Sequence, residues 1–134
     1  MILFRPVGLR ELELIAASDW RAFPPRLPHQ PIFYPVLTQV YAQAIAQNWN
    51  TKDPNSGYAG FVTRFEVSDE FAGRYPVQIV GSRQDQELWV PADELEKFNG
   101  QIRGKIRVIA SFYGCEFTGD INPATNLPAS IGPA

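Results

Sequence analysis

Residues that most metal and redox sites require are almost missing from this chain. It contains one cysteine, Cys115, and one histidine, His29. A single cysteine cannot form a disulfide within the chain, and these two residues are too few for a structural zinc site, which is built from Cys and His ligands. No basic residue flanks Cys115, so nothing activates its thiol as a nucleophile. The sequence therefore predicts neither an internal disulfide nor a structural transition-metal site.

An excess of charge of one sign is also missing. The chain has 12 basic and 14 acidic residues and a formal net charge of −2, so no global field recruits nucleic acid or an anionic membrane. No run approaches the roughly 18 apolar residues of a membrane-spanning helix. Residues 1–4 are apolar, but Arg5 and Pro6 follow at once, and the basic start and longer apolar stretch of a signal peptide are lacking. We expect a cytoplasmic protein with no membrane partner and no strong signal for nucleic acid.

Two common signatures of enzymes are absent as well. Ser, His and Asp all occur, but the chain has no Gly-x-Ser-x-Gly elbow of a hydrolase. It also has no glycine-rich phosphate loop of the Walker or dinucleotide-binding type. What is present is the composition of an ordinary soluble protein of 134 residues, 45% hydrophobic and 19% charged. That length favours one domain with a core large enough to fold without cross-links.

Hydrophobic periodicity divides the chain into strands and helices. The clearest strand is 61–67, in which three apolar residues alternate with Arg64 and Glu66. Further strand patterns occur at 2–5, 77–80, 87–90 and 105–112. Helical spacing predicts helices at 8–17, 38–49 and 91–102. The predicted fold class is α+β, with mixed, mainly antiparallel sheets and about three helices.

The same periodicity predicts which side chains face the core. Thr38 is the expected N-cap of the second helix. In the first helix, Glu11 is expected to face water together with its polar neighbours. The stripe of the second helix expected to pack on the sheet consists of Val40, Tyr41, Ala44, Ile45 and Trp49. The side chains of the last strand expected to share one side are Ile106, Val108, Ala110 and Phe112.

The composition changes after Gly114. Residues 118–134 are rich in Gly, Pro and Asn and have almost no apolar periodicity. We therefore expect a single domain over residues 1–114 and a flexible C-terminal tail over residues 115–134. Removal of the residues after about Thr118 is expected to leave a folded protein.

A stiff, proline-rich segment lies between the first two predicted helices. Residues 20–36 contain five of the 12 prolines, which exclude regular helix and favour extended pieces. The segment also carries Arg26 and several aromatic side chains. These residues either line a ligand-binding cleft or pack against the first helix, and the sequence leaves both interpretations open.

The stretch of greatest chemical interest begins at Glu87. This carboxylate stands at the head of the apolar residues Leu88, Trp89 and Val90, which favour a largely buried strand, and Pro91 follows. A strand end holds a side chain rigidly and leaves it open to solvent. That position suits a catalytic acid, and it is equally common for a solvated edge residue.

The order of these segments resembles the small mono-ADP-ribosyltransferase fold. The resemblance depends on an arginine closing the first strand, an aromatic-rich strand leading into a helix, the strand 61–67, the Glu87 stretch and a final apolar strand. It covers roughly residues 2–113. The chain is also similar to a group of uncharacterised bacterial proteins often labelled "ADP-ribosylation/crystallin J1". Each motif is short, and only their order and spacing give them weight.

The resemblance implies roles for four residues. Arg5 would hold the ribose or phosphate of NAD, because its planar guanidinium suits bidentate recognition of oxygen atoms. Glu87 would bond the nicotinamide ribose and stabilise the oxocarbenium charge that develops when the glycosidic bond breaks. Tyr34 would stack on the nicotinamide ring, and Asp85 would help to select the acceptor. The implied activity is transfer of ADP-ribose from NAD to an unknown acceptor.

One motif departs from the family pattern. Many members have Ser-Thr-Ser where this chain has Phe33-Tyr34-Pro35, which removes two hydroxyl ligands. Two classes of function therefore stay open: a transferase that cleaves NAD, and a non-catalytic module that binds a nucleotide-type small molecule or another partner. In the enzyme, Arg5, Tyr34 and Glu87 converge on one cleft, whereas in the module Glu87 is free to point elsewhere.

Each residue also has a purely structural interpretation. Arg5 can pair with an acidic neighbour at the end of its strand. Tyr34 can be a packed aromatic residue with its hydroxyl at the surface. Glu87 can be a solvated edge residue without a chemical role. The sequence alone does not choose between these structural roles and the chemical ones.

Overall fold

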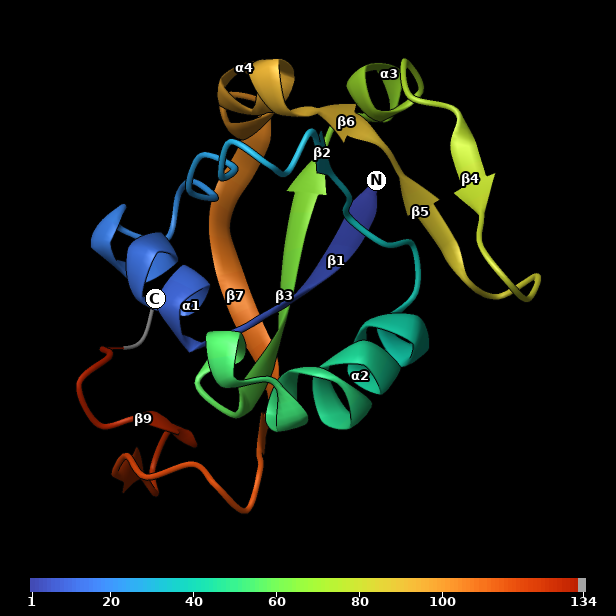
Figure 1. Cartoon of the computed structure of the whole chain (residues 1–134). Helices are drawn as coiled ribbons and strands as arrows, with labels where there is room; N and C mark the ends of the chain where they lie inside the picture. The colour runs from blue at the N-terminus through green and yellow to red at the C-terminus, as the bar shows by residue number, and fades with distance from the viewer. Residues whose placement is uncertain (133–134) are drawn as a thin grey trace.

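An antiparallel sheet of three strands runs through the middle of the molecule (Figure 1). The computed structural model describes residues 1–132. The central strand is β3 (Ala59–Val67), which pairs with β1 (Ile2–Val7) on one side and with the long β7 (Ile102–Tyr113) on the other. The alternation predicted for residues 61–67 is confirmed, because the three apolar side chains are buried and Arg64 is exposed.

One residue of the proline-rich segment extends this sheet beyond β1. Val36 bridges Phe4 of β1 on one side and Glu87 of β5 (Gln86–Leu88) on the other. The backbones of Val36 and Phe4 exchange hydrogen bonds of 2.7 and 2.9 Å. β5 pairs in turn with β4 (Val77–Ile79). Glu87 therefore lies on an extended sheet, with the backbone of Val36 between it and β1.

Helices surround the sheet (Figure 1). The α-helices of the described residues are α1 (Leu9–Ala17), α2 (Gln39–Asn48), α3 (Asp69–Ala72) and α4 (Leu95–Asn99). The 3-10 helices are η1 (Asn50–Lys52), η2 (Pro54–Ser56) and η3 (Ala92–Glu94). No helix within residues 1–132 has both the length and the apolar character needed to cross a membrane.

Two very short strands complete the upper part of the molecule. They are β2 (Ile32–Phe33) and β6 (Val90–Pro91), and they pair in antiparallel register. Every strand pairing among the described residues is antiparallel. The predicted α+β class with antiparallel sheets is therefore confirmed, and the structure has about four α-helices where about three were expected.

The first strand continues through Pro6, although we expected it to end there. The N–H of Phe4 points away from β3, toward Val36. Because backbone groups two residues apart point to the same edge of a strand, the missing N–H of Pro6 also falls on the edge away from β3. Proline is tolerated at such a position because no ladder hydrogen bond is lost. The prediction of a strand limited to 2–5 was therefore too short.

The third predicted helix is shorter than the pattern of apolar residues indicated. α4 ends at Asn99, whose side-chain amide exchanges two 2.9 Å hydrogen bonds with the backbone of Phe23. Ile102, the last residue of the predicted helix, instead opens β7 opposite Val67. The spacing of Ile102 also fits a helix, but its pairing with β3 places it in a strand.

The predicted buried stripe of the second helix is only partly correct, because Tyr41 packs on the sheet side but Val40, Ala44 and Trp49 are exposed. Thr38 is the N-cap, as expected, and accepts a hydrogen bond from the Tyr41 amide at 3.2 Å. The side chains that are fully buried against the sheet are those of the small residues Ala42 and Ala46. A side chain at Gly60 of β3 would collide with the Ala46 carbonyl. The backbones of α2 and β3 are therefore close together. This short distance favours small side chains over bulky ones on the face of α2 that packs on the sheet.

A bulge divides the apolar pattern of β7. Val62 pairs with Ala110, but the next residue of β3, Thr63, pairs with Val108, so one residue of β7 is extra. A bulge of this kind moves the following side chains to the opposite face. Ile106 and Val108 contact the main core, whereas Ala110 and Phe112 pack with α2. The expectation that all four share one side is therefore wrong.

The C-terminal segment packs on the domain, where its composition predicted a flexible tail. It forms two short strands, β8 (Ile121–Asn122) and β9 (Leu127–Pro128), which pair with each other. The side chains of Leu127 and Ile131 are each 6% exposed and belong to the main core. Leu127 and Ile131 are isolated apolar residues and give no periodic pattern. Their packing on the core could therefore not be predicted from the composition of the segment. Residues 133–134 lie outside the described part of the chain.

Candidate functional site

A cleft of about 750 Å³ opens beside residues Arg5, Pro6 and Val7 of β1. Its walls come from β1, the start of α1, the proline-rich segment, the C-terminal half of α2, and the loop that contains η1 and η2. We call it the β1 cleft, and the residues used below to describe it are Arg5, Glu11, Arg26, Tyr34, Asn50, Asp53 and Ser56. Its volume is in the range of natural small-molecule sites.

Arg5 is buried and neutralised at one wall of this cleft. Its guanidinium donates two hydrogen bonds to the Glu11 carboxylate, from Nε at 2.8 Å and from one terminal nitrogen at 3.1 Å. The other terminal nitrogen approaches the Tyr34 carbonyl at 3.5 Å. The guanidinium carbon lies 4.7 Å from the centre of the Phe33 ring. Arg5 therefore has the acidic neighbour that its structural interpretation required, and the expectation that Glu11 faces water is wrong.

Arg26 lies in the same cleft without such a partner. Its Nε donates to the Ile32 carbonyl at 3.0 Å, and no carboxylate oxygen of the described residues lies within 4.0 Å of its guanidinium. Burial, and then the neighbouring Arg5, lower the pKa of Arg26 from its ordinary value, while Glu11 acts in the opposite direction. The charged form is thus partly desolvated and repelled, so an anion placed here would stabilise it.

Tyr34 lies close to both arginines. The guanidinium carbons of Arg5 and Arg26 are each 5.8 Å from the centre of its ring. The residue is 42% exposed, so part of it remains open to a ligand. Cations at this distance attract the ring, and they hold it in place beside the cleft.

The opposite wall of the cleft carries a relay of polar side chains. Asn50 donates from Nδ2 to the Ser56 hydroxyl at 3.0 Å, and Ser56 donates in turn to the Asp53 carboxylate at 2.8 Å. The second oxygen of Asp53 accepts the Asn55 amide at 3.1 Å. The Asp53 charge is thus used to cap η2 and to orient Ser56. The relay makes this wall rigid.

Glu87 is held in a fixed position outside this cleft. The residue is 9% exposed, and its two carboxylate oxygens accept hydrogen bonds from the Tyr41 hydroxyl at 3.1 Å and from the Trp89 indole at 2.8 Å. Burial, and then the Glu87 carboxylate, raise the pKa of Tyr41 to about 12. Tyr41 therefore stays protonated at physiological pH and keeps donating to Glu87.

Arg5 and Glu87 project from opposite faces of the extended sheet. Directly paired residues point to the same face, so Phe4, Val36 and Glu87 share the side on which α2 packs. Arg5 follows Phe4 and points to the other face, toward α1. The structure therefore brings Arg5 and Tyr34 into one cleft and leaves Glu87 outside its lining.

Asp85 occupies the turn between β4 and β5. Its carbonyl accepts the Val80 amide at 2.8 Å, and its carboxylate approaches the Ser82 amide at 3.4 Å. Its charge contributes to the raised pKa of Tyr41, after burial and the effects of Glu87. Asp85 is thus near the Glu87 side of the molecule and does not line the β1 cleft.

Four of the residues used to describe the β1 cleft had no functional role in the sequence interpretation: Glu11, Asn50, Asp53 and Ser56. Glu11 lies on α1, and no local pattern pairs it with Arg5 of β1. Asn50 gave no usable signal, since an asparagine between helix and loop is common. Arg26 was noted as a cleft candidate, and it does line the cleft.

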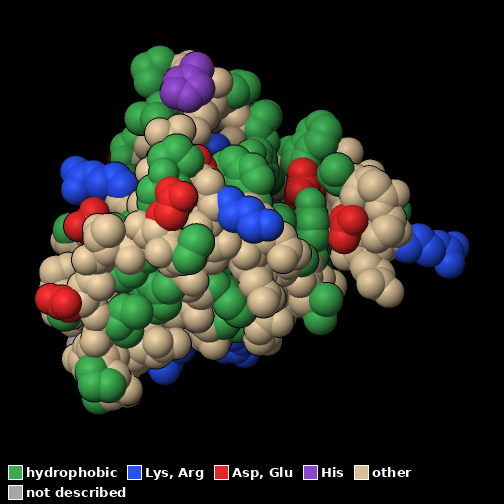
Figure 2. Space-filling view, turned by 60° about the horizontal axis from the view of Figure 1, so that its bottom comes forward, with side chains coloured by type: hydrophobic (Ala, Val, Ile, Leu, Met, Phe, Trp, Pro, Cys, Tyr) green, Lys and Arg blue, Asp and Glu red, His purple; other side chains and the backbone are tan. Residues whose placement is uncertain are grey.

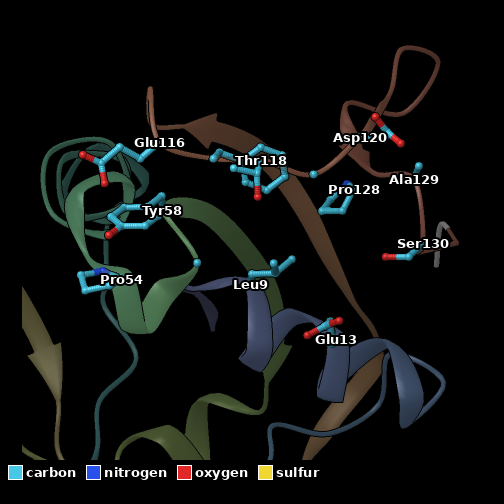
Figure 3. A pocket seen from close by; sticks show the side chains of 13 residues that line it. Leu9, Glu13, Pro54, Tyr58, Glu116, Thr118, Asp120, Pro128, Ala129 and Ser130 are labelled. Atoms are coloured by element: carbon cyan, nitrogen blue, oxygen red, sulfur yellow. The ribbon is translucent and has the colours of Figure 1, made fainter.

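A second hollow, of about 540 Å³, lies between α1, Tyr58 and the C-terminal segment. Figure 3 shows Tyr58 and Glu116 at one end of it and Asp120 and Ser130 at the other. Among the described residues, its lining has acidic side chains and no lysine, arginine or histidine. None of the residues singled out from the sequence belongs to it. We call it the C-terminal hollow.

The described residues form no large patch of one charge on the face of the molecule shown in Figure 2. Figure 2 turns the lower end of Figure 1 toward the viewer, and charged side chains are scattered among hydrophobic ones on this face. No group of three or more metal-ligating side chains occurs within residues 1–132. Comparison of the chain with protein-family models, with curated proteins and with solved structures found no match.

Proposed function

We propose that the protein is a binding module that holds a nucleotide-type small molecule in the β1 cleft. The observation that carries this proposal is Arg26, a half-buried cation without a carboxylate partner among the described residues. Its guanidinium is suited to a phosphate, because its free donors form paired hydrogen bonds with phosphate oxygens. The adjacent, partly exposed ring of Tyr34 offers an aromatic face to a base or nicotinamide ring.

NAD is the nucleotide that the resemblance to ADP-ribosyltransferases implies. The sequence order of Arg5, Tyr34 and Glu87, on β1, the bridging segment and β5, supports an ADP-ribosyltransferase-like fold as part of this proposal. The geometry favours binding without chemistry, because Arg5 is neutralised by Glu11 and Glu87 lies outside the cleft lining. We therefore propose that the phosphate of the nucleotide binds Arg26, and that Arg5 holds the Tyr34 ring in position.

The proposal predicts that Arg26 determines affinity. Calorimetric titration of the wild-type protein with NAD and with ADP should give saturable binding. Arg26→Gln should weaken binding of both by about 10- to 100-fold, the scale of one charge-assisted hydrogen-bonded contact. The matched control is Arg83→Gln, an exposed arginine in the β4–β5 turn, which should leave the affinity unchanged. Equal affinities for wild type and Arg26→Gln would refute the assignment of Arg26.

A second candidate function is transfer of ADP-ribose from NAD to an acceptor. The observation that favours it is the fixed carboxylate of Glu87, whose β5 strand adjoins Val36 of the cleft wall. In this reaction the bond between the ribose C1′ and the nicotinamide nitrogen breaks, and the nitrogen keeps the electron pair. An acceptor nucleophile then bonds to C1′ and gives up its proton to solvent. A preorganised carboxylate lowers the barrier by stabilising the developing positive charge.

Glu87→Gln separates the two candidates. If the protein is a transferase, release of nicotinamide from NAD should fall by about 10²–10³-fold in this variant, while NAD affinity barely changes. The exposed Glu96→Gln serves as the control and should keep full activity. Absence of nicotinamide release by the wild type, measured by chromatography under conditions where NAD binds, would leave the binding module as the function.

A further inference from the structure

One buried acceptor in the wall of the β1 cleft has no donor. Asn50 is 5% exposed, and its Oδ1 is covered from solvent and makes no hydrogen bond to any described residue. Leaving a buried acceptor unsatisfied is costly for a folded protein. Asn50 nevertheless lines the cleft. A donor that reaches Oδ1 through the wall of the cleft, from water or from a ligand, would satisfy it.

The hydrogen bonds of Ser56 determine which side-chain atom of Asn50 is left without a partner. Ser56 gives its single hydroxyl proton to the Asp53 carboxylate, so toward Asn50 it is an acceptor only. The Asn50 atom that contacts Ser56 at 3.0 Å must therefore be the amide nitrogen. The remaining oxygen, Oδ1, is a pure acceptor, and rotation of the amide would break the contact with Ser56.

We propose that Asn50 is a specificity-determining residue of the β1 cleft and that its Oδ1 accepts a hydrogen bond from a hydroxyl or amino group of the ligand. This inference rests on the proposed binding function and adds the chemical class of the ligand. The ligand carries an anionic group for Arg26 and a small neutral donor for Asn50. The donor is small because Oδ1 is covered in the free protein, so the group must enter the wall of the cleft.

The test compares ADP with analogues that each lack one donor: 2′-deoxy-ADP, 3′-deoxy-ADP and the purine riboside diphosphate without the 6-amino group. The wild-type protein should bind one of these about 10-fold or more weakly than it binds ADP, because that analogue leaves Oδ1 unpaired. Asn50→Ala should abolish this discrimination.

The outcomes are distinguishable. If wild type binds ADP and all analogues equally, or if Asn50→Ala discriminates like wild type, the role of Asn50 is refuted and the binding function stands. If wild type does not bind ADP at all, the binding function fails and this inference fails with it. Thermal unfolding checks that Asn50→Ala is folded. If it is not, Ser56→Ala serves instead, because releasing the amide nitrogen lets the side chain rotate and should also reduce the discrimination.

Discussion

Replacement of Glu11 by alanine is expected to lower the free energy of unfolding by about 2–4 kcal/mol. The change leaves the Arg5 guanidinium buried, with its side chain 6% exposed, and removes the carboxylate that accepts two of its hydrogen bonds. Losing one partner of a fully buried pair costs about 3–5 kcal/mol. The loss expected for Glu11→Ala is smaller because the Glu11 side chain is 21% exposed and water compensates in part. Equilibrium denaturation measures the change.

Two further variants make this prediction specific. Glu13→Ala removes a neighbouring carboxylate whose contact with Arg10 is long, at 3.9 Å, and exposed, so it should cost less than about 1 kcal/mol. The double change Arg5→Met with Glu11→Leu removes both charges and should recover much of the stability, because no unpaired charge stays buried. If Glu11→Ala lowers the free energy of unfolding no more than Glu13→Ala does, the Arg5–Glu11 pair does not stabilise the fold.

The second large effect is expected in the C-terminal segment. Leu127→Ala and Ile131→Ala should each lower the free energy of unfolding by about 2–4 kcal/mol, because each truncates a side chain that belongs to the main core. Ile121→Ala, in the same segment but 38% exposed, should cost less than about 1 kcal/mol. Removal of residues 118–134 should destabilise at least as much as either core variant. A truncated protein as stable as the full chain would show that this packing contributes nothing.

The elements that could be predicted from the sequence are those governed by local patterns. The alternation of residues 61–67, the spacing of α1 and the N-cap at Thr38 are all local, and each was found. The α+β class followed from their order. The boundaries of α4 and of β1 were missed because pairing with distant strands decided them.

The errors in side-chain placement have a common physical origin. Hydrophobicity placed Val40 and Trp49 of α2 against the sheet, but the helix backbone approaches β3 closely at Gly60 and the small Ala42 and Ala46 are buried there. The bulge in β7 switches faces after Val108, and no residue type in that strand marks it. Both effects depend on the shape of a neighbouring element, which a periodic pattern does not contain.

The candidate site could be predicted only in part. Arg5 and Tyr34 do lie together, and Arg26 lines the same cleft. The partner of Arg5 was missed because Glu11 belongs to a different element, and Glu87 was grouped with Arg5 by sequence order alone. Order along the chain places residues on strands, but the face that each side chain takes depends on register.

The central claim is that a nucleotide binds in the β1 cleft beside Arg26, and the most direct test is to map the backbone amide chemical shifts of isotope-labelled protein during a titration with ADP. We predict saturable shifts concentrated at Arg26, Tyr34 and Asn50, with none in the C-terminal hollow around Thr118 and Ser130. Shifts that never saturate, or that concentrate in the C-terminal hollow, would contradict the account.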